Sequence, residues 1–463
     1  MASVNKRKVS TSNYTAGGLG GKAAKESYRD QLKRLVCSCL LGEDLFYIDG
    51  KSVIDNIHEV MLKASNEDCI DIMRMAKNEC HLRHAPLYML IVLAEKKALT
   101  KELVYEMITR TDDITELLAL YLKDGKKPLP KQMEKGIALS FKKFDEYQLA
   151  KYKAEKKTIS LRDAMILTHP KAETKEQNEL YSKLMNKSLA TPYTWETELS
   201  AGKDKKETWT NLINSGKIGG LAMLRNIRNM MSAGVDKNVI SKGIKDIHNS
   251  RLLPLNYLKA ATINDEFSRD IEDSMLESYK NLPKLTGNTL FIIDVSGSME
   301  SAMSSRSSFT RYDAACAMAM LAANQCENFY LVATAGNDAE CKCASEYIQY
   351  PKKGFDITKQ IHATNGNIGG GGIFTRQCLE WCKDKFKDVN FDRIIVFSDS
   401  QDCDRKNSVP NPFGKYNYIC DVSSEKYGIN YSGKWTAEIS GFSEYFLTYI
   451  ASMEGIQNTF SQN

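Results

Sequence analysis

Three oxygen donors alternate in the segment DVSGSM: the carboxylate of Asp294 and the hydroxyls of Ser296 and Ser298. They follow directly on the apolar run TLFII, so a tight turn at the end of a strand can direct all three toward one point. Gly297 gives this turn the backbone freedom that it needs. Oxygen ligands without His or Cys select a hard divalent cation, and Mg²⁺ suits small donors that leave room for water. The segment therefore predicts a cation site.

Two more oxygen donors occur later in the chain. Thr375 stands where the glycine stretch GGGGIF runs into an expected helix, and Asp399 ends the apolar run IIVFS. An alternative interpretation is that the hydroxyls only cap a turn and a helix start. We favour a divalent-cation site, with Mg²⁺ as the expected ion, whose ligands are Asp294, Ser296, Ser298, Thr375 and Asp399.

Short apolar runs rich in β-branched residues must position these donors. They occupy residues 288–295, 328–335 and 391–399, and each is followed by a polar loop and a helical pattern such as SFTRYDAACAMAMLAANQC. This alternation predicts parallel strands joined by crossover helices, which is a doubly wound α/β domain. Ligands of such domains bind at the carboxyl ends of the strands, where the donors are expected.

The chain before this region has a different hydrophobic pattern, one that is typical of helices. From Glu26 to about Tyr279, segments such as SVIDNIHEVMLKAS and APLYMLIVLAEKKA carry apolar residues at the spacing of one helix face. No consensus repeat is evident, so we expect stacked helical hairpins of the HEAT-like kind, each burying its apolar face on its neighbours.

Charge is distributed unevenly between the two regions. From Thr286 to the end, 16 Lys and Arg face 20 Asp and Glu, a net charge of −4; the whole chain carries +5, so the first 285 residues carry +9. The imbalance points to an anionic partner for the helical region.

Cations and aromatic rings are interleaved in the segment from Phe141 to Lys171, where Tyr147 and Tyr152 stand among lysines. This mixture suits phosphate contacts with occasional base stacking, although a solvated helix face would have the same composition. The RNA-binding candidates in this segment are Lys142, Lys143, Lys151, Lys153, Lys156 and His169.

Arginines in two further helical segments pose a separate question. Arg225 and Arg228 lie three residues apart in AMLRNIRNM, and Arg251 opens RLLPLNYLKA. Buried arginines are costly unless they are paired, so these side chains either form ion pairs inside the domain or point into a wet cavity. In a cavity, the guanidinium groups suit phosphate or extruded bases.

The order of the five oxygen donors resembles the metal-ion-dependent adhesion site of von Willebrand factor A domains. That resemblance implies a metal ion with one coordination position left open by the protein. A carboxylate of a partner protein would fill this position. The sequence departs from the family at Ile373 and Phe374, because the family usually has its Thr directly after Gly-Gly.

The helical region resembles the TROVE module of Ro autoantigen-type RNA-binding proteins. Seven segments carry this resemblance in order: NYTAGGL, CLLGEDLFY, LRHAPLYML, KFDEYQLAKY, LTHPK, AMLRNIRNM and RLLPLNYLKA. It implies an all-α ring of HEAT-like repeats closed by the A domain. Single-stranded 3′ ends of misfolded RNAs enter the basic hole of such a ring, and small Y RNAs bind its outer surface. The family's Y RNA contacts match Lys151 and His169.

From these resemblances we expect a flexible segment at 1–25, a TROVE helical-repeat domain at 26–284 and an A-type domain at 285–463. The expected partners are Y-like and misfolded noncoding RNA, with an exoribonuclease or an acidic protein ligand at the metal site. The rival function is a metal-dependent protein-interaction scaffold.

The sequence contains no P-loop, no H-E-x-x-H motif and no defensible catalytic triad, so we do not expect an enzyme. It has neither a signal-peptide pattern nor a long apolar run, which predicts a cytoplasmic protein that does not engage a membrane. We expect it to be a monomer.

Overall fold

The computed structural model describes residues 14–16, 22–24, 27–38, 51–78, 82–123, 125, 128–152, 159–249, 252, 254–302, 309–368, 370–399, 402–404, 411–422, 435–440 and 445–456. The chain forms two compact units. One is Leu45–Lys280, called here the helical unit, and the other joins Met1–Asp44 to Asn281–Asn463 and is called the α/β unit.

The expected domain boundary between residues 284 and 285 lies four residues beyond the boundary between the units. Helix α1 (Tyr28–Ser38) belongs to the α/β unit, where it contacts the last strand of the sheet, whereas the sequence assigned it to the helical domain. Most of the N-terminal segment 1–25 lies outside the described residues, and the described part contains the antiparallel pair β1 (Tyr14–Ala16) and β2 (Lys22–Ala24).

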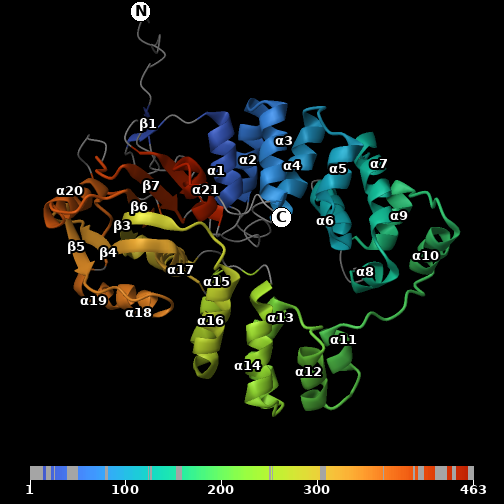
Figure 1. Ribbon diagram of the computed structural model, residues 1–463. Helices are drawn as coiled ribbons and strands as arrows, with labels where there is room; N and C mark the ends of the chain where they lie inside the picture. The colour runs from blue at the N-terminus through green and yellow to red at the C-terminus, as the bar shows by residue number, and fades with distance from the viewer. Residues whose placement is uncertain are drawn as a thin grey trace, which may run out of the picture. The chain divides into compact units, whose positions relative to one another are not determined.

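The helical unit consists of short helices that follow one another along the chain (Figure 1). Their bounds are α2 Lys51–Lys63, α3 Asn66–Asn78, α4 His84–Glu95, α5 Lys101–Met107, α6 Thr111–Leu122, α7 Lys131–Ser140, α8 Glu146–Lys151, α9 Leu161–Thr168, α10 Lys175–Met185, α11 Trp195–Ser200, α12 Lys205–Asn214, α13 Gly220–Ser232, α14 Lys237–Lys245, α15 Pro254–Ile263 and α16 Ser268–Ser278, with 3-10 turns at Phe141–Lys143, Asp246–Asn249 and Asp265–Phe267.

Many of these helices pack on the next helix but one, as stacked hairpins do: α5 on α7, α7 on α9, α12 on α14 and α14 on α16. One of these contacts depends on Gly136 of α7, where a Cβ would lie 2.4 Å from Cβ of Val104 in α5. Helix α4 is buried on nearly all sides, which explains its almost continuous apolar sequence. The expected helical-repeat domain is therefore confirmed.

A buried ionic cluster holds the start of α6 in place. Asp113 is fully buried and accepts hydrogen bonds from Lys77 at 3.3 Å and Arg83 at 3.1 Å, while Arg83 also pairs with Asp112 at 2.6 Å. The backbone N–H groups of Thr109 and Arg110 donate to the same Asp113 oxygen at 3.0 Å. A buried charge is tolerated where all its acceptor positions are used in this way.

The α/β unit is built on a six-stranded sheet in the order β5-β4-β3-β6-β7-β8 (Figure 1). Strands β4, β3, β6, β7 and β8 run parallel to one another, and only the edge strand β5 is antiparallel to its neighbour β4. The bounds are β3 Leu285–Asp294, β4 Cys326–Asn337, β5 Lys342–Ile348, β6 Arg393–Ser398, β7 Tyr416–Asp421 and β8 Ala437–Ser440, with helices α17 Arg311–Gln325, α18 Asp356–Ala363, α19 Asn365–Ile368, α20 Thr375–Lys385 and α21 Tyr445–Met453 and a 3-10 turn at Gly297–Glu300.

Helices cover both faces of this sheet. On one face, α20 packs over Leu290, Ile292 and Val396; on the other, Phe446 of α21 lies edge-on to Phe397 of β6. The alternation of side chains along each strand sends neighbours to opposite faces, so strands that are buried on both sides are apolar throughout. The predicted α/β domain with parallel strands is confirmed. None of the described helices is long and apolar enough to span a bilayer.

Candidate functional site

The DVSGSM turn leaves the carboxyl end of β3 and is fixed there by backbone and side-chain hydrogen bonds. Val295 N donates to the carbonyl of Thr334 in β4 at 2.9 Å. Ser296 N donates to Oδ1 of Asp294 at 2.9 Å, and the hydroxyls of Ser296 and Ser298 lie 3.1 Å apart. The turn therefore gathers the three predicted donors at one point of the sheet edge.

The second oxygen of Asp294 connects this turn to the neighbouring strand. Ser398, the last residue of β6, donates its hydroxyl to Asp294 Oδ2 at 2.7 Å. Asp399 follows directly, so the parallel pairing of β3 with β6 brings the two predicted carboxylates to the same edge. Both are fully buried.

Burial and the neighbouring charge of Asp399 raise the pKa of Asp294 to about 7, although the donors Ser296 and Ser398 act in the opposite direction. Two carboxylates withdrawn from water disfavour each other's ionised form. A divalent cation between them would remove this cost, because it supplies the opposite charge.

The glycine stretch lies against the DVSGSM turn. Gly297 N donates to the carbonyl of Gly371 at 3.2 Å. A Cβ on Gly371 would lie 1.7 Å from the carbonyl oxygen of Gly336 in β4, so only glycine permits this approach. The two intervening residues, Ile373 and Phe374, are buried, and the chain then enters α20 at Thr375.

Thr375 itself is 1% exposed, and its hydroxyl has no hydrogen-bond partner among the residues that the structure describes. The N-cap of α20 is Phe374, and no described N–H group donates to the Thr375 hydroxyl, so this hydroxyl does not cap the helix. Buried hydroxyls are normally paired, and an unpaired one at this place is what a missing ligand would explain.

The donor set suits a hard cation. It offers two buried carboxylates, a pair of adjacent serine hydroxyls and one unpaired threonine hydroxyl. No group of three or more His, Cys, Asp or Glu side chains that could hold a metal ion occurs within the described part of the chain, so hydroxyl ligands would have to complete the shell. Asp399 already has one cationic neighbour, because Arg311 Nη1 donates to its Oδ2 at 2.7 Å.

The predicted RNA contacts of the helical unit fall into two groups. Lys142 pairs with Glu173, and Lys143 donates to the carbonyls of Tyr105 and Ile108, where it satisfies the end of α5. Partial burial lowers the pKa of Lys143. These two lysines are thus engaged within the fold, whereas Lys151 and His169 are exposed.

Lys151 belongs to a row of cations and tyrosines. Its Nζ lies 5.8 Å from the ring centroid of Tyr147 and 5.4 Å from that of Tyr152. Arg110 lies 5.0 Å from the Tyr152 ring, and Lys217 lies 4.4 Å from the ring of Tyr193. We call this set the cation–tyrosine surface: Arg110, Tyr147, Lys151, Tyr152, Tyr193 and Lys217.

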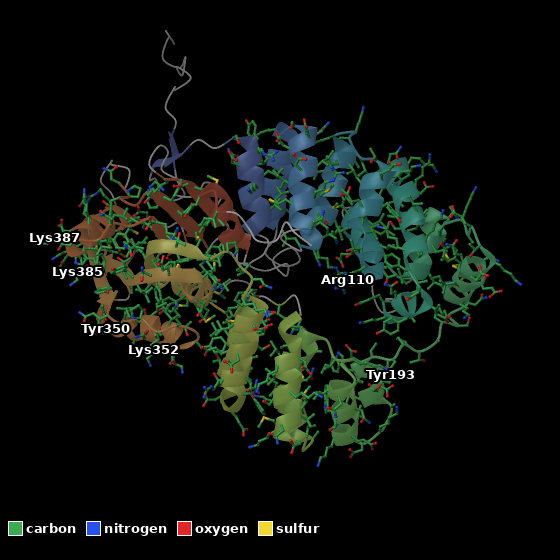
Figure 2. The ribbon with its side chains drawn as sticks, viewed as in Figure 1. Arg110, Tyr193, Tyr350, Lys352, Lys385 and Lys387 are labelled. Atoms are coloured by element: carbon green, nitrogen blue, oxygen red, sulfur yellow. The ribbon has the colours of Figure 1, made fainter. Side chains whose placement is uncertain are left out.

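Hydrogen bonds join the parts of this surface. Tyr147 Oη donates to the carbonyl of Tyr193 at 3.4 Å, and Glu146 accepts from Ala190 N at 3.1 Å. Tyr147 and Tyr193 nevertheless remain 45% and 43% exposed, so a large part of each side chain faces solvent. Figure 2 labels Arg110 and Tyr193, which come from segments more than eighty residues apart.

The remaining predicted contacts are placed as follows. His169 ends α9 in the left-handed conformation, with φ 48°. Arg225 and Arg228 are exposed on α13, and neither makes an ion pair with a described residue. The internal ion pairs that the sequence left open are therefore not formed with described residues, because the two side chains lie on the face of α13 opposite its buried residues. Lys153, Lys156 and Arg251 lie outside the described residues.

An array of short stacked helices and a doubly wound α/β unit with an oxygen-donor site at its sheet edge define a two-unit helical-repeat protein. Residues 183–328 match the TROVE domain family. The fold resembles the crystal structure of the Deinococcus radiodurans RO (RSR) protein with a TM-score of 0.56 and 15% sequence identity, over 93% of this chain and 100% of that one. The expected resemblance to the TROVE family is therefore found over residues 183–328, and the fold as a whole is similar to that of a Ro protein.

Two curated relatives share a short segment. The mouse protein named telomerase protein component 1 is 35% identical over 78 residues, and its rat counterpart is 33% identical over 78 residues. These cover 16% of this chain but only 3% of either relative.

Sequence reasoning missed Ser398, Arg311, Arg110, Tyr193 and Lys217. Arg110 and Lys217 stand alone in loops, and nothing in their local pattern distinguishes them from other exposed cations. Arg311 did carry a signal, because it is a cation at the first position of a helix, where it is electrostatically misplaced.

Proposed function

We propose that the helical unit binds RNA through the cation–tyrosine surface and that the α/β unit adds a divalent-cation site. The alternation of three cations with three tyrosines, two of them with a large part of the side chain facing solvent, is the observation that carries the RNA part. Cations neutralise phosphates, and tyrosine rings stack on unpaired bases. The TROVE domain and the net charge of +9 over the first 285 residues support the same conclusion.

The RNA is a small noncoding RNA of the Y type, bound on the outer surface of the helical unit. Its unpaired bases stack on Tyr147 and Tyr193, while Lys151 and His169 contact phosphates. We further propose that single-stranded 3′ ends of misfolded RNAs enter a basic hole, where Arg225 and Arg228 meet them. The protein then serves noncoding-RNA quality control, or presents RNA to an exoribonuclease.

The cation site is of the adhesion type known from von Willebrand factor A domains. Asp294, Ser296, Ser298, Thr375 and Asp399 would hold Mg²⁺, which would offer an open coordination position to an acidic side chain of a partner. The unpaired hydroxyl of Thr375 is the observation that favours this. A metal-dependent protein scaffold is thus a second candidate function for the α/β unit.

Binding of a labelled Y-like stem-loop with unpaired bases tests the RNA part. Tyr147→Ala with Tyr193→Ala should weaken binding by roughly tenfold or more, since each stacked base contributes about 1–3 kcal/mol. The matched control is Lys385→Ala with Lys387→Ala, which removes two exposed cations of the α/β unit (Figure 2) and should change affinity little. Equal affinity of both folded double variants would exclude this surface as the binding site.

Lys151→Ala with His169→Ser separates the two RNA sites. This variant should impair the stem-loop and leave a duplex with a 3′ single-stranded tail bound nearly as before. Equal loss for both RNAs would mean a single shared site.

Binding of the acidic protein partner should instead disappear with EDTA. It should withstand a fourfold rise in salt concentration, which RNA binding through phosphate contacts does not.

A further inference from the structure

Arg311 occupies a position that the helix to which it belongs does not favour. It is the first residue of α17, directly after the N-cap Thr310, where the helix dipole disfavours a positive charge. Asp313 completes the capping box of this helix, so the turn does not need a cation. The place of Arg311 is explained by what its side chain contacts outside α17.

That contact is the carboxylate of Asp399. Arg311 Nη1 donates to Asp399 Oδ2 at 2.7 Å, across a separation of 88 residues in sequence. The Asp399 side chain is fully buried, and that of Arg311 is 23% exposed, so the pair is largely withdrawn from water. Ion pairs in such surroundings are held firmly, because losing one partner leaves the other charge buried and unpaired.

The backbone of Arg311 is anchored beside the DVSGSM turn. Arg311 N donates to the carbonyl of Ser301 at 3.0 Å, and Ala302 pairs with Thr310 as an isolated bridge. The 3-10 turn that contains Ser298 ends at Glu300, one residue before this contact. Arg311 thus starts next to one half of the cation site and extends its guanidinium to the other half at the end of β6.

We propose that Arg311 is the internal counter-ion of the cation site, so that a divalent cation must compete with its guanidinium for Asp399. The inference rests on the cation site proposed above. Without a metal, Arg311 balances one of the two buried carboxylates and keeps the edge of the sheet folded. With a metal, the guanidinium and the ion are like charges beside one carboxylate, which weakens binding of the ion. Binding and release of the ion are thereby coupled to the start of α17.

The test is Mn²⁺ binding by the full chain after its metal has been removed with EDTA. Free Mn²⁺ is measured by electron paramagnetic resonance, and the thermal unfolding temperature is measured in parallel. Arg311→Gln should bind Mn²⁺ roughly tenfold more tightly or better, since the competing charge is gone. Without metal, this variant should also unfold at a lower temperature than the wild type does. Addition of Mn²⁺ should raise its unfolding temperature by more than it raises that of the wild type. Arg376→Gln is the matched control, because Arg376 is the second residue of α20 and pairs with Glu380 and Asp404; it should bind Mn²⁺ like the wild type.

Equal or weaker Mn²⁺ binding by folded Arg311→Gln would overturn the inference, since Arg311 would then hold Asp399 in place for the metal. If Arg311→Gln folds only when Mn²⁺ is present, the inference is supported. If it folds under neither condition, Arg311→Lys decides, because a shorter side chain with a point charge should compete less well and bind Mn²⁺ more tightly than the wild type does. Absence of Mn²⁺ binding by every variant and the wild type would refute the cation site itself, while the stem-loop assay would still report on RNA binding.

Discussion

Asp294→Asn should stabilise the metal-free protein above pH 7 and remove part of its pH dependence. The replacement is compatible with the site: its amide oxygen can accept from Ser296 N, as Asp294 Oδ1 does at 2.9 Å, and its NH₂ can donate to the Ser398 hydroxyl, which now donates to Oδ2 at 2.7 Å. What the variant loses is the buried negative charge.

The magnitude follows from the pKa of Asp294, which burial first and Asp399 second raise from 3.8 to about 7. A folded-state pKa above the unfolded one means that the protonated form stabilises the fold. This stability is complete below pH 3.8 and is lost as the pH rises through about 7. Some three pKa units at 1.36 kcal/mol each give a loss of about 4 kcal/mol by pH 8. The Asn side chain has no charge, so the variant should not show this loss.

Urea denaturation in EDTA at several pH values between 4 and 8 measures the effect. The difference in unfolding free energy between Asp294→Asn and the wild type isolates this one group and should grow with pH. Saturating Mg²⁺ should stabilise the wild type at pH 8 by on the order of 1–3 kcal/mol and leave the variant unchanged.

Asp113→Asn is a control of opposite sign. Burial alone would raise the pKa of Asp113, but Lys77, Arg83 and two backbone N–H groups together outweigh burial and lower it. The charged form of Asp113 therefore stabilises the fold above its unfolded pKa, and this variant should lose stability at neutral pH.

A pH-independent difference in unfolding free energy between Asp294→Asn and wild type would refute the electrostatic reasoning. If Mg²⁺, Mn²⁺ and Ca²⁺ all fail to stabilise the wild type, DVSGSM is only a capped turn.

Other predictions concern the neighbouring elements and the helical unit. Glu454→Gln should cost about 3–5 kcal/mol in urea denaturation, because it leaves the Arg393 guanidinium buried 2.6 Å from a neutral group. Gly371→Ala should destabilise the α/β unit by about 1–3 kcal/mol and abolish Mn²⁺ binding, since the new Cβ would overlap a backbone carbonyl. Arg225→Ala with Arg228→Ala should weaken binding of a 3′-tailed duplex and lower its salt slope by roughly one to two units, with blunt duplex as the comparison. Unchanged tail affinity would remove these arginines from the proposed hole.

The helices and the central strands could be read from the sequence because their patterns are local. The expected run 288–295 lies almost entirely within β3, and 328–335 lies within β4. Apolar residues spaced about 3.6 residues apart mark the buried face of a helix, and continuous runs of β-branched residues mark a strand that is buried on both faces. The antiparallel edge strand β5 was not expected, because its half-exposed sequence KCASEYI has no such run.

The candidate cation site could also be predicted from the sequence. The oxygen donors of DVSGSM alternate over a short segment, and the ends of parallel strands meet at one edge of a sheet. The sequence by itself determined that Asp294 and Asp399 end strands, but not which charges would surround them. Arg311 reaches Asp399, Ser398 reaches Asp294, and Lys217 reaches Tyr193 only after the strands and helices have packed. Their partners lie 24 to 104 residues away along the chain, so local pattern carries no trace of them, and only the tertiary structure decides which charges share a buried site.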